Sequence, residues 1–208
     1  MLPEGKPLEA KRNLKTNTFS DRLVTLVQVI FAVVIGGGLI EFGEFLFFPK
    51  NIIICYALIG VFLTSILSWT EYHARMEQYP YTPTKLGVFR LQADVFIVGT
   101  YAFLLFAGTR QEQSIESYLW GFSVVFLLYV LSGWLRRREH SDSGASRLRL
   151  LITYFLVFSL SVPSLFRILI CCTDISTFYL NQVFVWLPLL AMLIFRLHGF
   201  CKLPLRVS

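Results

Sequence analysis

The chain has 208 residues, of which 55% are hydrophobic and only 15% are charged, with a formal net charge of +6. A soluble domain has about 25% charged residues, so this chain lacks the polar side chains needed to cover a water-facing surface. The composition excludes an ordinary soluble protein and predicts a chain that is solvated by lipid.

Six long apolar segments follow one another along the sequence. Each is close to the roughly 20 residues that cross about 30 Å of hydrocarbon as a helix. Only helices and closed barrels span a bilayer, and continuous apolar runs differ from the short alternating strands of a barrel. We therefore expect an all-α fold, a polytopic transmembrane helical bundle.

The expected spans are, in chain order, residues 22–40, 51–69, 87–107, 118–135, 148–172 and 178–197. They form one transmembrane domain over residues 19–200, preceded by a short cytoplasmic segment, 1–18, and followed by a cytoplasmic tail, 201–208. We expect the N-terminal segment to be partly helical or mobile.

Basic residues collect in every second loop. The N-terminal segment, the second loop, the fourth loop and the C-terminal end hold 16 of the 19 Lys and Arg residues, and the other three loops hold Lys50, Arg110 and Arg167. Cytoplasmic loops retain positive charge, so this pattern predicts six spans with both termini in the cytoplasm, in a bacterial-type inner (plasma) membrane. Because the charge is confined to one face, anionic lipid headgroups are the expected partners and direct nucleic-acid binding is not expected.

The sequence contains no motif that is typical of an enzyme active site or a cofactor site. The four cysteines have no CxxC spacing, and the three histidines lie at cytoplasmic span ends (Cys55, Cys171, Cys172, Cys201, His73, His140, His198). There is no HExxH motif, no serine elbow and no pair of carboxylates within one span. We expect no enzyme activity, no cofactor and no metal site.

Charged residues inside spans are costly in lipid and mark places of structural or functional interest. Arg90 and Asp94 are four residues apart on span three, where they can form a local ion pair, either as a structural pair or as a polar patch on a permeation path. Arg167 follows Pro163 by four residues near the end of span five, and either reaches the interface or pairs with an acidic residue. The acidic residues considered for that pairing are Asp174, Glu41 and Glu44.

Three consecutive glycines, residues 36–38, lie near the outer end of span one. Glycines weaken a helix, so this triplet indicates close packing, a hinge or an unwound outer mouth. Gln28 lies on the same span and requires a partner, either a neighbouring helix or water in a pore.

The triplet Phe19-Ser20-Asp21 opens span one. It resembles the FSD motif of the lysosomal-type potassium channel family, whose bacterial members are of about this size. The resemblance implies six spans with both ends in the cytoplasm, a tetramer, and a first helix that lines the pore. It also implies a hydrophobic constriction five positions after the Asp, which is Leu26 here.

Four further residues bear on this resemblance. The family's Arg before the motif corresponds to Lys15, and its Trp and His at the end of helix two correspond to Trp69 and His73. Arg22, directly after the motif, departs from the family pattern. The alternative interpretation is that Ser20 and Asp21 simply cap the first helix.

Two functions follow from these observations, and a small-solute transporter is a weaker third. The first is a homo-oligomeric cation channel with span one at the axis, Leu26 as the constriction, and Thr25 and Gln28 as polar lining. The spans carry too few polar residues for a pore within one subunit, so a dimer or tetramer is expected.

The second function is a membrane anchor or sensor that recruits an acidic cytosolic protein, as in a bacterial defence or signalling complex. The basic residues expected to face that partner are Arg136, Arg137, Arg138, Arg147 and Arg149.

Overall fold

The computed structural model describes residues 6–48, 51–109, 115–140, 145–172 and 176–200. For residues 6–18, 107–109, 145–151 and 196–200 it describes the helical backbone only. Six helices make up this part of the chain: α1 (Lys6–Phe47), α2 (Ile52–Gln78), α3 (Lys85–Thr109), α4 (Ile115–His140), α5 (Ala145–Cys172) and α6 (Thr177–Phe200). No strand occurs among the described residues.

The prediction of an all-α bundle of six apolar helices is confirmed. Each expected span lies within one helix, except that Asn51 precedes α2 as its N-cap, where its side chain accepts a hydrogen bond from the Ile53 N–H at 2.9 Å. All six helices are long and apolar enough to cross a membrane, which is compatible with a multi-pass membrane protein.

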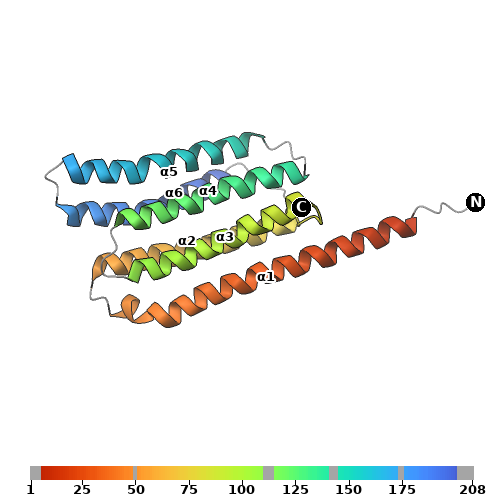
Figure 1. Cartoon of the computed structure of the whole chain (residues 1–208), viewed down its shortest axis with the longest axis horizontal. Coiled ribbons are helices and arrows are strands. Elements are labelled where there is room, and N and C mark those ends of the chain that lie inside the picture. The colour runs from red at the N-terminus through yellow and green to blue at the C-terminus, as the bar shows by residue number, and fades with distance from the viewer. Residues whose placement is uncertain (1–5, 49–50, 110–114, 141–144, 173–175, 201–208) are drawn as a thin grey trace, which may run out of the picture.

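The helices run side by side, with α1 and α5 on opposite sides of the bundle (Figure 1). Helix α1 packs on α2 and α3, α3 packs on α4, and α4 in turn packs on α5 and α6. The apolar segment of α1 is the least buried of the six and that of α4 is the most buried. Helix α4 is therefore the centre of the bundle, and α1 is an edge helix.

Aromatic side chains on α4 hold the bundle centre together. The Phe126 ring stacks on Phe155 with centroids 4.5 Å apart and meets Phe158 edge-on at 4.8 Å, which joins α4 to α5. Phe122 meets Tyr118 edge-on at 4.9 Å and Tyr101 of α3 at 6.3 Å. These fully packed rings fill the interior, because stacked and edge-to-face pairs bring large apolar surfaces into contact.

Two of the alternatives for the first helix are excluded. Helix α1 begins at Lys6, so Ser20 and Asp21 lie inside it and cannot cap its N-terminus. The helix also continues through residues 36–38 without a break, so the glycines do not form an unwound mouth. Instead, a Cβ at Gly38 would lie 2.7 Å from Leu105 Cδ1, which shows that this glycine permits close packing of α1 on α3. Gly36 and Gly37 face open space.

Candidate functional site

A buried polar cluster lies at one end of the bundle, where α2 and α4 end and α3 begins. We define the polar cluster by Ser68, Tyr72, Arg75, Tyr81, Arg90, Asp94, Tyr129, Ser132 and Glu139. The up-and-down order of the helices brings these three helix ends together, although the residues are far apart in sequence (Figure 1). Buried polar groups are costly unless they are hydrogen-bonded, so their partners decide what the cluster can do.

Arg90 and its partner Glu139 are the most deeply buried ion pair of the polar cluster. The Arg90 Nη1 lies 2.6 Å from Glu139 Oε2, and both side chains are only 1% exposed. Its Nη2 donates to the Tyr79 carbonyl oxygen at 2.5 Å, and the guanidinium lies 4.6 Å from the centre of the Tyr81 ring. The charge is therefore neutralised by one carboxylate and covered by an aromatic face.

Glu139 holds the loop between α2 and α3 against the end of α4. Its Oε1 accepts hydrogen bonds from the Thr82 N–H at 2.7 Å and from Thr82 Oγ1 at 2.6 Å. Next to it, His140 Nε2 lies 3.0 Å from the Pro80 carbonyl oxygen. With Arg90 on its other oxygen, the Glu139 carboxylate joins α3, α4 and this loop.

Asp94 does not form the local ion pair with Arg90 that their spacing predicts. Its Oδ2 accepts a hydrogen bond from the Tyr81 hydroxyl at 2.7 Å, and its Oδ1 accepts one from Ser132 Oγ at 2.6 Å. The long Arg90 side chain instead reaches Glu139, where it gains a carboxylate and a backbone carbonyl together. The prediction of an Arg90–Asp94 pair is wrong, because the sequence does not show these more distant partners.

Tyr81 connects the polar cluster to α1. Its side chain is fully buried, its hydroxyl donates to Asp94, and its backbone N–H donates to Ser20 Oγ at 3.1 Å. Burial raises the pKa of the Tyr81 phenol, and the neighbouring Asp94 carboxylate raises it further. Tyr81 therefore remains a neutral hydrogen-bond donor to Asp94 at every physiological pH.

A second ion pair lies on α2. Arg75 Nε donates to Glu71 Oε1 at 2.7 Å, and the Arg75 guanidinium lies 5.7 Å from the centre of the Tyr129 ring. The Tyr129 hydroxyl is hydrogen-bonded to Ser68 Oγ, which is also buried. Arg75 of α2 is thus paired with Glu71, as Arg90 of α3 is paired with Glu139.

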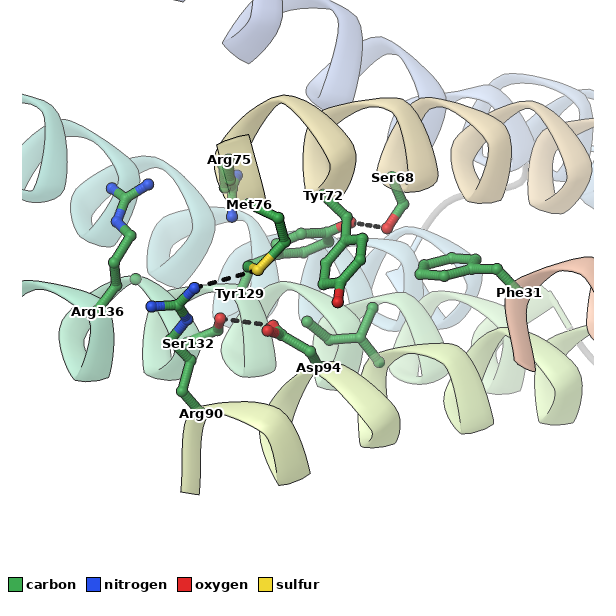
Figure 2. Close-up of a pocket in the computed structure, with 12 residues that line it drawn as sticks. Phe31, Ser68, Tyr72, Arg75, Met76, Arg90, Asp94, Tyr129, Ser132 and Arg136 are labelled. Atoms are coloured by element: carbon green, nitrogen blue, oxygen red, sulfur yellow. Dashed lines mark hydrogen bonds between the residues drawn. The ribbon is translucent and has the colours of Figure 1, made fainter. Parts of the chain in front are cut away.

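The cluster surrounds a small cavity, with about 20 Å³ of space for water, that is partly open to the outside. Figure 2 shows the lining side chains converging from α2, α3 and α4, with Phe31 of α1 at one side. Asp94 and three arginines, Arg75, Arg90 and Arg136, line it. A cavity with these polar walls has room and partners for water.

The predicted pore residues on α1 divide between two faces. Leu26 is 49% exposed and Thr25 is exposed, with its hydroxyl donating to the Asp21 carbonyl at 2.8 Å. Gln28 instead is hydrogen-bonded to His73 of α2, with 2.8 Å between Nε2 and Nδ1. Leu26 and Thr25 thus lie on the outward face, and Gln28 ties α1 to α2.

The FSD motif residues also differ in burial. Ser20 is buried and accepts the Tyr81 N–H, Phe19 is half-buried, and Asp21 is exposed. Trp69 and His73, which the resemblance places near the motif, lie with ring centroids 6.3 Å apart. His73 contacts α1 through Gln28, about two turns beyond the motif.

The remaining predicted site residues lie at the two ends of the bundle. Arg167 is 74% exposed, and its Nη1 lies 4.0 Å from Glu116 Oε1, a partner that the sequence did not suggest. Arg137 and Arg138 are exposed, whereas Arg136 lines the cavity and lies 4.9 Å from the centre of the Tyr79 ring. The side chains of Arg147 and Arg149, and the whole of Asp174, lie outside the described residues.

Of the nine residues of the polar cluster, sequence reasoning identified only Arg90 and Asp94, and the residues it missed include Tyr81, Glu139, Ser132 and Tyr129. A signal was present for two of them: Glu139 is the only acidic residue in the basic run from Arg136 to His140, and Tyr81 stands between two prolines. Ser132 and Tyr129 have no such signal, because a serine or tyrosine in an apolar helix is common.

The fold and the polar cluster define a class, an all-α bundle of six membrane-length helices with ionised side chains buried at one end. Comparison of the chain with protein-family models, with curated proteins and with solved structures found no match.

Proposed function

We propose that copies of this chain associate in the membrane through the outward face of α1 and conduct cations along that face. The observation that carries the proposal is the exposure of α1: it is an edge helix, and Thr25, Leu26, Val29 and Val33 lie along its outward side. Gly36 and Gly37 continue this side with space for a neighbouring helix, as small residues do at helix contacts in membranes.

A path between copies fits the packing better than a path within one chain. The centre of the bundle is filled by side chains that are fully buried, among them Tyr101, Leu104, Leu119 and Phe122. Oligomers of membrane proteins commonly form closed rings, in which one helix of each copy can face the axis. The resemblance to the FSD potassium channels, in which the first helix lines the pore, supports the same arrangement.

The charge pattern supports an orientation. The polar cluster lies at the end of the bundle that also carries Lys85 and the run Arg136–Arg138. Positive residues remain on the cytoplasmic side, so we place this end and both termini in the cytoplasm, in a plasma or inner membrane.

The test is potassium flux from liposomes that contain the purified protein, with wild type beside Leu26→Asn. A leucine constriction excludes water, so an asparagine there is expected to raise the flux roughly tenfold. Leu165→Asn is the matched control, because Leu165 of α5 is also 49% exposed but lies across the bundle. Equal flux for Leu26→Asn and Leu165→Asn would reject Leu26 as the constriction.

A second function, the anchor that recruits an acidic cytosolic protein, is favoured by one observation. Helix α1 continues for more than three turns before its apolar span begins at Phe19, and this part of the sequence holds four basic residues (Lys6, Lys11, Arg12, Lys15). A basic helix that extends from the membrane is suited to an acidic surface. Absence of flux in every variant, with intact oligomers, would favour this second function.

A further inference from the structure

Asp94 is a buried carboxylate whose partners are all neutral. Its two oxygens accept hydrogen bonds from the Tyr81 and Ser132 hydroxyls, and no cationic side chain of the described residues forms an ion pair with it. The nearest arginines on α2 and α3 have their own carboxylates, since Arg75 pairs with Glu71 and Arg90 with Glu139. Asp94 is thus held by hydroxyl groups, and no cation is in ion-pair contact with it.

A buried carboxylate without an ion-pair partner is costly, and binding a cation or a proton lowers that cost. The same cavity is lined by Arg75, Arg90 and Arg136, whose positive charges oppose a metal cation. A proton neutralises the carboxylate without needing a shell of ligands. The arginines oppose both ions, but a proton needs only one carboxylate, and Asp94 is the one carboxylate among the described residues that line the cavity.

A protonated Asp94 needs an acceptor, and one is present. The Tyr72 hydroxyl is buried near the Tyr81 side chain and forms no hydrogen bond of good geometry among the described residues. It lines the same cavity as Asp94, and Figure 2 shows both groups pointing into it. The Tyr72 oxygen can accept the hydrogen bond that a carboxylic acid would donate, either directly or through one water molecule.

We propose that Asp94 is a reversible proton-binding site. Binding forms one O–H bond on a carboxylate oxygen and removes one negative charge, and the proton comes from water through the open side of the cavity. The Tyr81 and Ser132 hydroxyls stabilise the ionised form, and Tyr72 stabilises the protonated form. This site does not depend on cation conduction.

The charged and titratable groups around Asp94 come from each element packed against it. They are Glu71, Tyr72 and Arg75 of α2, Tyr81 of the loop, Arg90 of α3, and Tyr129, Arg136, Glu139 and His140 of α4, while α1 contributes the apolar Phe31. Four of these groups form the two ion pairs, Arg75 with Glu71 and Arg90 with Glu139.

Tyr81 links the protonation state of Asp94 to helix α1. Tyr81 donates its hydroxyl to Asp94 and its backbone N–H to Ser20, so a single residue separates the proton site from α1. Protonation weakens the first of these bonds, because the acceptor loses its charge.

The experiment is infrared titration of the full-length protein in lipid nanodiscs, which follows the carbonyl stretch of a protonated carboxylic acid from about pH 9 to about pH 5, where buried carboxyls titrate. We expect a band that appears as the pH falls and is missing in Asp94→Asn. Absence of a titrating band in wild type, or its persistence in Asp94→Asn, would overturn the proposal.

Two further variants keep the test decisive if Asp94→Asn does not fold. Ser132→Ala removes a donor to the carboxylate and is expected to move the titration midpoint up by about one pH unit, the size of one hydrogen bond. Tyr72→Phe removes the acceptor and is expected to move it down. The matched control is Ser123→Ala. Ser123 is also a buried serine of α4, but its hydroxyl donates to the Ser159 carbonyl and not to Asp94, so this variant should leave the midpoint unchanged. Shifts of Ser132→Ala and Tyr72→Phe in the same direction would reject the site.

Discussion

Replacement of Arg90 by leucine is expected to lower the free energy of unfolding by about 3–5 kcal/mol, the usual cost of removing one partner from a buried ion pair. The variant leaves the Glu139 carboxylate, which is 1% exposed, without its cation. It also removes the donor to the Tyr79 carbonyl, so the loop between α2 and α3 loses a contact as well. Denaturant and thermal unfolding of the purified protein in detergent measure the loss.

Arg167→Leu is the matched control for this prediction. It removes an arginine from an ion pair whose N···O distance is 4.0 Å and whose arginine is 74% exposed, so the expected loss is at most about 1 kcal/mol. An Arg90→Leu protein that unfolds at the same midpoint as Arg167→Leu would show that the buried pair does not stabilise the bundle.

Replacement of Gly87 by alanine is expected to cost about 1–3 kcal/mol, the range for forcing an extra carbon into a packed site. Gly87 lies in the first turns of α3, where an added Cβ would meet the Thr82 carbonyl oxygen and would lie 2.8 Å from Glu139 Oε1. The obstacle is backbone, which cannot rotate away as a side chain can. Thr82 must therefore move, and its two hydrogen bonds to Glu139 are disturbed.

The control for Gly87→Ala lies on the same helix. A Cβ at Gly99 would meet nothing within 4 Å, so Gly99→Ala is expected to be neutral or to stabilise α3 by up to about 1 kcal/mol through the higher helix propensity of alanine. Unfolding midpoints of the two variants in the same detergent measure the difference. Equal midpoints would contradict the close approach of Thr82 to Gly87.

The helices could be predicted from the sequence because the apolar runs are long and loops interrupt them clearly. The rotation of each helix could not be predicted. Apolar residues lie on every face of α1, so the pattern does not indicate that Val27 and Phe31 face the bundle while Leu26 and Val33 face outward. Only the packing of α1 on its neighbours distinguishes these faces.

The polar cluster was only partly predictable for a related reason. Arg90 and Asp94 stand out because charges are rare in apolar segments, and both belong to the cluster. The partner of Arg90 is Glu139, which is 49 positions away and follows three arginines, so it looks like part of a solvated basic loop. Local spacing favoured the Arg90–Asp94 pair, and tertiary contacts overrode it.

Association of copies through α1 is the central claim, and disulfide cross-linking tests it most directly. With the four native cysteines replaced, a single cysteine is placed at Val33 of α1, which is 65% exposed, or at Leu160 of α5, which is 66% exposed. Disulfides require Cα atoms within about 7 Å, so only a residue at the contact between copies will cross-link efficiently on oxidation in the membrane. The account predicts covalent dimers from Val33→Cys and few from Leu160→Cys. Absence of dimers from Val33→Cys, or equal yields from both positions, would contradict it.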